Sequence, residues 1–182
     1  MMLSITVLNF DRIVETYGFI YGDVLLKKIK QILFEKADRP EIKQVLPQKA
    51  KTVEEALADY EQTLLPDAES FGQTVYVDGK YVGDVWCYCI DMDEEPNCML
   101  SFCIFELEYW NKGIATTAVK MFIQNICALY HVKTIGAFTF SDNLASIRVL
   151  EKNGFVVKEE FEEDEEDAED DDDRQYLLHC HD

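Results

Sequence analysis

The chain has 182 residues, 48% of them hydrophobic and 12% aromatic, which suits one folded domain and excludes a disordered chain. Its formal net charge of −19 argues against nucleic-acid binding, because that needs a positive surface. No apolar run approaches the roughly 20 residues of a membrane span and no signal peptide is evident, so we expect a cytoplasmic protein that does not bind a membrane.

The first part of the chain predicts a strand followed by a helix. The stretch Leu3–Phe10 is apolar enough for a strand, and residues 23–35 place their apolar side chains on one helical face. We expect residues 1–39 to contribute this atypical strand and helix to a single domain that spans residues 1–182.

The next segments predict a helix and a hairpin. Residues 52–65 open with the capping-box pattern Thr-x-x-Glu, which marks a helix start. The stretches Gly72–Val77 and Tyr81–Ile90 are typical of strands, and Asp78 and Gly79 between them are typical of a two-residue hairpin turn.

The second half alternates strands and helices. The pattern predicts a strand over Met99–Leu107, a helix over Ile114–Tyr130, a strand over Thr134–Phe140 and a helix over Leu144–Asn153. Two short strands, over residues 155–157 and 175–178, finish the chain. This order predicts a mixed α/β fold with a βαβ unit.

An acidic run separates the last two strands. Residues 159–173 hold 13 acidic side chains in 15 positions. Such a block usually extends into solvent as a hairpin loop, and it could instead attract a cationic substrate. The six cysteines form no Cys-x-x-Cys pair, so we expect neither a zinc ribbon nor a disulfide, and we expect no metal site.

The most informative segment is Tyr109–Thr116, with the sequence YWNKGIAT. It follows a predicted strand and opens a predicted helix, and Gly113 permits a tight turn there. The first N–H groups of a helix have no partner within it, and the helix dipole makes that end positive. The segment therefore predicts a binding site for a phosphorylated cofactor.

A second segment, Ser141–Phe155, carries the pattern N-x-x-S-x-x-x-L-E-K-x-G-F. Together the two segments resemble the GNAT family of N-acetyltransferases, and within it the branch of ribosomal-protein N-terminal and spermidine acetyltransferases. The family's loop reads Q/R-x-x-G-x-G/A, and here Trp110 takes the first place and Ala115 the last. The resemblance implies an acyl-coenzyme A N-acyltransferase fold, with a central mostly antiparallel sheet.

The resemblance also implies acetyl-coenzyme A as co-substrate. Its diphosphate should lie on the backbone N–H groups of the loop, and an N–H near Phe105 or Glu106 should face the thioester oxygen. Asn143 should help to hold the cofactor arm, and Ser146 should lie near its sulfur. The expected cofactor-binding residues are Phe105, Trp110, Asn111, Lys112, Gly113, Ile114, Ala115, Thr116, Asn143 and Ser146.

The sequence indicates the catalytic residues less specifically than the cofactor-binding residues. A general base must reach the amine, and Glu106 is the preferred candidate. Many relatives place a Tyr four residues after Ser146 to protonate the thiolate, but Leu150 stands there, so Ser146 or a water must serve. Glu108, Asp91 and Asp93 are candidates for binding a cationic substrate.

The expected reaction is transfer of an acetyl group to a primary amine by direct attack in a ternary complex. The acceptor could be a protein N-terminus, a polyamine, an amino sugar or another small amine. A catalytically weak or inactive acyl-coenzyme A-binding module that acts through a protein partner is the alternative. A homodimer is possible, because edge strands of this fold often pair between subunits.

Residues 10–35 also resemble a short, degenerate fragment of a diguanylate cyclase (GGDEF) domain, around the sequence YGFIYGDVLL. The GGDEF signature itself is absent, so cyclase activity is not expected. The fragment is either a coincidence or a fused remnant.

Overall fold

The computed structural model describes residues 3–6, 39–45, 69–160 and 173–180. The chain divides into two compact units, one made of Met1–Thr6 with Glu69–Asp182 and the other of Val7–Ala68. In the second unit the described element is the short helix α3 (Pro40–Val45), whose Ile42 side chain is buried. The helices expected over residues 23–35 and 52–65 lie outside the described residues, and the single domain stays a prediction.

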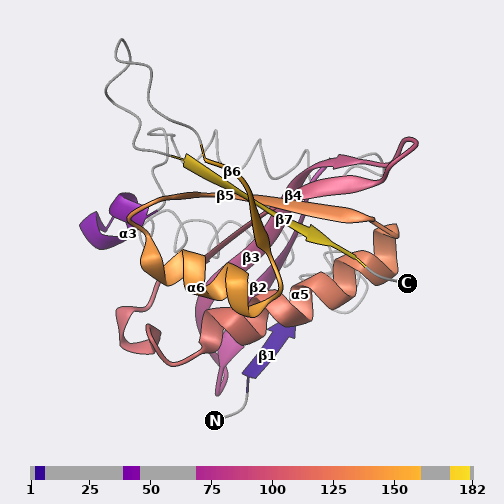
Figure 1. Ribbon diagram of the computed structural model, residues 1–182. Helices are drawn as coiled ribbons and strands as arrows, with labels where there is room; N and C mark the ends of the chain where they lie inside the picture. The colour runs from indigo at the N-terminus through magenta and orange to yellow at the C-terminus, as the bar shows by residue number, and fades with distance from the viewer. Residues whose placement is uncertain (1–2, 7–38, 46–68, 161–172, 181–182) are drawn as a thin grey trace, which may run out of the picture. The chain divides into compact units, whose positions relative to one another are not determined.

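The first unit is built on a seven-stranded sheet in the order β1-β2-β3-β4-β5-β7-β6 (Figure 1). All neighbouring strands are antiparallel except β4 and β5, which are parallel and are connected through helix α5 (Ile114–Tyr130). The mostly antiparallel sheet with one βαβ unit is therefore confirmed. The strands are β1 (Leu3–Thr6), β2 (Phe71–Val77), β3 (Lys80–Asp91), β4 (Asn97–Ile104), β5 (Thr134–Phe140), β6 (Val156–Glu160) and β7 (Asp173–His179).

The structure confirms the predicted turn between β2 and β3 but ends β4 earlier than predicted. Asp78 and Gly79 join β2 to β3 with positive φ angles of 49° and 79°, as a two-residue hairpin turn of the expected kind requires. The strand expected to reach Leu107 ends instead at Ile104, and a 3₁₀ turn, η1 (Leu107–Tyr109), follows. Strands β6 and β7 flank the acidic run, most of which lies outside the described residues.

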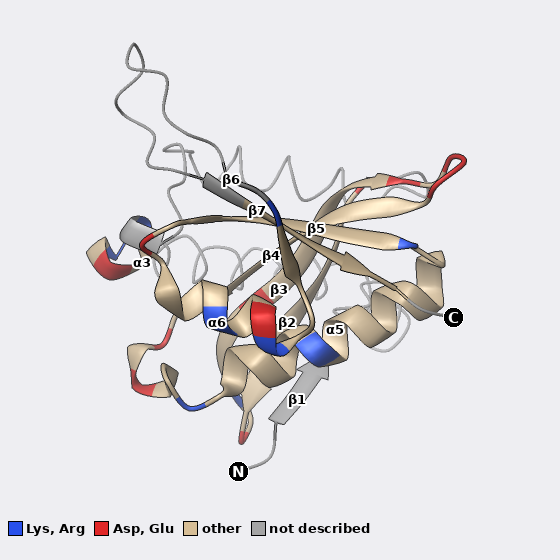
Figure 2. Ribbon diagram, in the orientation of Figure 1, with Lys and Arg blue, Asp and Glu red and all other residues tan. Residues whose placement is uncertain are grey.

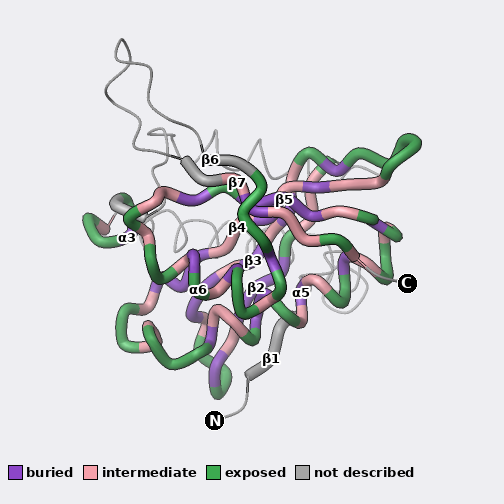
Figure 3. The backbone as a smooth tube through the Cα atoms, in the orientation of Figure 1, coloured by how far each residue is buried: buried purple, intermediate pink, exposed green. Residues whose placement is uncertain are grey.

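Helices α5 and α6 (Leu144–Lys152) lie on one face of the sheet (Figure 1). Along α5 the buried positions recur at helical spacing, with exposed positions between them (Figure 3). The buried α5 side chains join those of the strands and of α6 in one hydrophobic core. They are Ile114, Ala118, Val119, Phe122 and Ile126.

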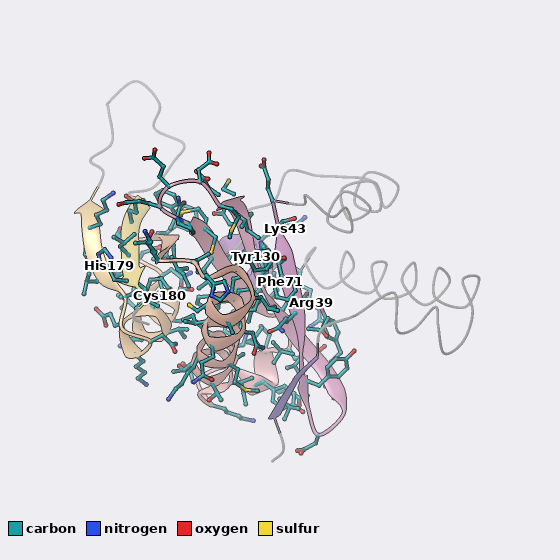
Figure 4. All side chains as sticks on the ribbon, turned by 90° about the vertical axis from the view of Figure 1, so that its right-hand side faces the viewer. Arg39, Lys43, Phe71, Tyr130, His179 and Cys180 are labelled. Atoms are coloured by element: carbon teal, nitrogen blue, oxygen red, sulfur yellow. The ribbon has the colours of Figure 1, made fainter. Side chains whose placement is uncertain are left out.

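The far end of α5 is fixed to the first residue of β2. The Phe71 ring lies 5.8 Å from the Phe122 ring and 5.9 Å from the Tyr130 ring, and Figure 4 shows Phe71 and Tyr130 side by side. Ring contacts at these distances stabilise one orientation of α5 on the sheet. None of the helices within the described ranges has the length and hydrophobicity to cross a membrane.

Candidate active site

A gap opens in the sheet between β4 and β5. The two strands pair only where Asn97–Met99 meet Thr134–Gly136. Beyond that point β4 stays paired with β3 as far as Ile104, while β5 pairs, among the described strands, only with β7. Residues 100–104 therefore have a strand on one side and the gap on the other.

The amides expected to face a thioester oxygen are directed elsewhere. The Phe105 N–H donates to the Val82 carbonyl at 2.8 Å, and the Glu106 N–H points to the same oxygen at 3.4 Å. Both groups thus face β3, on the side of β4 away from the gap. These two N–H groups therefore do not face the gap, because the β3–β4 ladder continues past the end of β4.

The same ladder identifies the amides that do face the gap. In an antiparallel pair, successive residues direct their N–H and C=O groups alternately to the two sides of a strand. Ile104 pairs with Gly83 and Phe102 with Val85, without interruption between them. Since Phe105 faces β3, the N–H groups of Phe102 and Ile104 face the gap.

The loop after β4 presents a cluster of backbone amides. Asn111 and Gly113 have positive φ angles of 57° and 76°, so the chain turns sharply before α5. The first helical hydrogen bond runs from the Thr117 N–H to the Gly113 carbonyl. Among the described residues, the preceding amides of residues 114–116 donate to no backbone carbonyl. Such amides at a helix start bind anions.

Gly113 is suited to close approach of a ligand. A Cβ built on it would meet no atom of the described residues within 4 Å, so this side of the loop is open to them. Its positive φ is a conformation that L side chains rarely adopt. The residues present therefore fit a diphosphate, which needs several amides and no intervening side chain.

Trp110 stands at the first position of the loop pattern, where the family usually has Gln or Arg. Its indole Nε1–H donates to the Ile104 carbonyl at 2.7 Å. That carbonyl ends β4 on the gap side, so the indole fixes the loop to the strand that borders the gap. Trp110 is half-buried and packs against the core, which makes it a support for the loop.

Replacing Trp110 with Phe should loosen this support. The ring packing is kept while one hydrogen bond is lost, so we expect a stability loss of about 1 kcal/mol. We also expect coenzyme A affinity to fall several-fold, because the amides of the loop are less well ordered. Urea unfolding and calorimetric titration measure the two effects. An unchanged affinity would show that the indole does not order the loop.

The start of α6 borders the other side of the gap. Asn143 caps the helix, with its Oδ1 accepting from the Ser146 N–H at 3.1 Å. Both side chains are half-buried just after β5, and their expected contacts with the cofactor stay predictions. Leu150 is 1% exposed and belongs to the core, so no titratable group replaces the Tyr that many relatives have there.

Asn153, at the C-terminal end of α6, connects that helix to the start of α5. Its Nδ2 donates to the Val149 carbonyl at 2.8 Å and to the Thr116 carbonyl at 3.2 Å. Thr116 lies in the first turn of α5, so α6 helps to place the amide cluster. The sequence pattern leaves Asn153 unspecified, and its role was not predicted.

Lys80 forms ion pairs with Glu106 and Glu108, the two acidic residues just before the loop. Its Nζ lies 2.5 Å from Glu108 Oε1 and 3.5 Å from Glu106 Oε2. Its hydrogen bond with Glu108 raises the pKa of Lys80, and the charge of Glu106 adds to the shift. Lys80 and Lys112 each lie 5.5 Å from the Tyr109 ring centre. Glu106 is thus paired with a cation, which opposes its expected role as a base.

The other expected substrate carboxylates lie at the opposite end of β4. Asp91 ends β3, pairs with Asn97 and accepts a hydrogen bond from the Asp93 N–H at 2.9 Å. Figure 2 shows this hairpin tip in red, at the end of the sheet where β4 and β5 are still paired. Asp91 and Asp93 are therefore not brought together with the loop of residues 111–116.

A family model for the GNAT acetyltransferase domain matches residues 26–156. The chain belongs to the GNAT acetyltransferase family. This membership makes it an acetyltransferase and supports acetyl-coenzyme A as the donor. The resemblance of residues 10–35 to diguanylate cyclases finds no support, because the GNAT match begins inside that fragment. No curated protein sequence matches the chain.

Solved structures agree with this GNAT fold. Spermidine N-acetyltransferase from Vibrio cholerae, in complex with coenzyme A and spermine, has a TM-score of 0.76 at 14% identity, covering 97% of this chain and 95% of the other. An aminoglycoside acetyltransferase in complex with coenzyme A has a TM-score of 0.66 at 16% identity, covering 98% and 95%. A domain from Methanocaldococcus jannaschii has a TM-score of 0.66 at 16% identity, covering 98% and 99%.

Proposed function

We propose that this acetyltransferase moves the acetyl group of acetyl-coenzyme A to a primary amine by direct attack in a ternary complex. The observation that carries the proposal is the gap between β4 and β5, whose open end has a helix start on each side. A slot of this form suits a long, narrow donor with a charged diphosphate at one end and a reactive thioester at the other.

The donor's diphosphate would bind the amides of Asn111–Thr116, with Lys112 as a possible charge partner. Its pantetheine arm would lie along the gap against the amides of Phe102 and Ile104. One of these would stabilise the oxyanion in place of the Phe105 amide first expected, a contribution that is often the largest in acyl transfer. Asn143 and Ser146 would contact the arm from α6. Holding the two reactants aligned can contribute about 7–11 kcal/mol to lowering the barrier.

The acceptor would be a cationic amine. The solved relatives support this, since one is a spermidine acetyltransferase bound to spermine and another is an aminoglycoside acetyltransferase. The strongly negative charge of the chain would also attract such acceptors. A protein N-terminus, a polyamine and other small amines all have the charge and the primary amine that such a site requires. Glu108, at the loop end of β4, is better placed to meet it than Asp91 or Asp93.

Ser146→Ala should slow turnover more than it weakens donor binding. The hydroxyl would protonate the departing thiolate, because Leu150 offers no proton. We expect kcat to fall about tenfold or more and the dissociation constant for coenzyme A to change less than twofold. Ser146→Thr, which keeps the hydroxyl, should recover part of the rate. If kcat of the alanine variant matches the parent, water protonates the sulfur.

A binding module without turnover is the second candidate function. Two observations favour it: Leu150 is buried where many relatives carry an acid, and Glu106 is paired with Lys80. Coenzyme A release, measured with acetyl-coenzyme A and a panel of amines, separates the two candidates. Release that depends on an amine supports the enzyme. Tight donor binding with no release on any amine supports the module.

Two further expectations stay predictions. The protein would act in the cytoplasm, and two copies could pair through an edge strand. Sedimentation velocity tests the second, where a single monomeric species over a wide concentration range would exclude the homodimer.

A further inference from the structure

The proposed reaction needs a group that takes a proton from the acceptor's ammonium, and the part of β3 and β4 that borders the gap offers one carboxylate for it. β4 and β5 carry no acidic residue at all. In the part of β3 that pairs with β4 between Met99 and Ile104, Asp84 is the only acidic residue. Asp84 pairs with Cys103, in the half of β4 that borders the gap.

Asp84 lies on the sheet face opposite the helices. Successive side chains of a strand alternate between the two faces. Val85 is fully buried in the core under α5 and α6, so Asp84 points to the other face together with Cys103. A donor in the gap meets α5 and α6 on the core side. The acceptor must therefore approach from the face that carries Asp84.

A local irregularity in β3 holds this carboxylate in place. On the β2 side Val75 pairs with Gly83 and Tyr76 with Tyr81, so Val82 is an extra residue, a β-bulge. The bulge brings Tyr81 to the same face as Asp84, three residues away. The Tyr81 hydroxyl donates to Asp84 Oδ2 at 2.6 Å.

The surroundings keep this donor protonated. Tyr81 packs between the rings of Tyr76 and Phe105, at 5.8 and 6.3 Å. Burial raises the pKa of Tyr81, and the negative charge of Asp84 raises it further. Burial and the same charge raise the pKa of Cys103 to about 12, so that thiol does not compete as a nucleophile.

We propose that Asp84, positioned by Tyr81, binds the ammonium group of the acceptor and takes its proton directly or through one water. This rests on the proposed acetyl transfer. The freed nitrogen forms a bond to the thioester carbon, and the sulfur leaves with the electron pair of the broken C–S bond and takes up one proton. The nitrogen gives up two protons in all, so one is released to solvent. Glu106, held by Lys80, is not needed for this step.

Asp84→Asn tests the proposal, with Asp78→Asn as the control in the exposed hairpin turn. We expect kcat/KM for an amine such as spermine to fall about 100-fold at pH 7 in Asp84→Asn, as removal of a general base does. Coenzyme A affinity and the unfolding midpoint should stay within error of the parent. Asp78→Asn should match the parent in all three measurements.

The pH dependence distinguishes proton removal from a structural role. Alkyl amines have pKa values of about 10, so their neutral fraction in solution rises steeply from pH 7 to pH 9.5. The deficit of Asp84→Asn should shrink at least tenfold over this range, because the amine no longer needs a base. Tyr81→Phe, which keeps the ring, should lower kcat about fivefold and leave coenzyme A affinity unchanged.

The outcomes separate the two proposals. No acetyl transfer by the parent chain to any amine would overturn the proposed function itself. Transfer by the parent with an unaffected Asp84→Asn variant would overturn only the role of Asp84. A deficit that is the same at pH 7 and pH 9.5 would also overturn it, because a structural defect does not follow the ionisation of the amine.

Discussion

Replacing Gly113 with Val should reduce coenzyme A affinity about 100-fold while the protein stays folded. The valine side chain would occupy the open side of the loop, and its branched Cβ disfavours the φ angle of 76°. Loss of two hydrogen bonds to a charged phosphate, each worth about 1.5 kcal/mol, accounts for a change of this size. Isothermal titration calorimetry with coenzyme A measures it.

Gly79→Val is the matched control for this substitution. Gly79 has nearly the same φ angle, 79°, and a Cβ there would likewise meet nothing within 4 Å in the described part of the chain, but it lies in the β2–β3 turn. Both variants should lose similar stability, about 1–3 kcal/mol for the strained backbone. Only Gly113→Val should lose coenzyme A affinity. Equal affinities in the two variants would mean that the diphosphate does not bind the residue 111–116 loop.

Replacing Gly83 with Ala should be the most destabilising small substitution in the sheet. A Cβ there would lie 2.3 Å from the Cys103 carbonyl oxygen and 2.9 Å from the Ile104 Cα. Both are backbone atoms, so β3 and β4 would have to separate where β4 borders the gap. We expect a loss of about 3 kcal/mol or more, a large part of a typical domain stability. Chemical unfolding followed by circular dichroism measures it.

Gly136→Ala shows whether the backbone contact is the cause. A Cβ at Gly136 would lie 2.6 Å from the Met99 Sδ, which belongs to a flexible side chain that can move aside. Both glycines are buried within strands, so the two changes differ mainly in what the methyl group meets. We expect a loss of about 1 kcal/mol or less for Gly136→Ala. Similar losses in the two variants would contradict the close approach of β3 and β4.

The parts of the fold that follow from local patterns could be predicted from the sequence. The apolar spacing of residues 114–130 gives α5, and Asp78-Gly79 gives the hairpin turn. Asn143 caps α6 as an Asn before a helix is expected to do. In each case the signal lies within a few residues of the feature it predicts.

The direction in which single backbone amides and side chains point could not be predicted from local patterns. Whether the Phe105 or the Ile104 amide faces the gap depends on the β3–β4 register, and a shift of one residue reverses the answer. The pairing of Glu106 with Lys80 joins residues 26 positions apart, and nothing in the local sequence indicates it. Asp84 was missed because the Val82 bulge, which brings Tyr81 to it, arises from strand pairing. A glycine inside a β-strand pattern, at Gly83, was the one available sign of an irregularity there.

A crystal structure of the chain with bound coenzyme A would show directly whether the loop of residues 111–116 binds the diphosphate. We expect the diphosphate oxygens within about 3 Å of the amide nitrogens of residues 114–116, and the pantetheine arm between β4 and β5. A diphosphate bound at another place on the chain, or an arm outside the gap, would contradict this expectation.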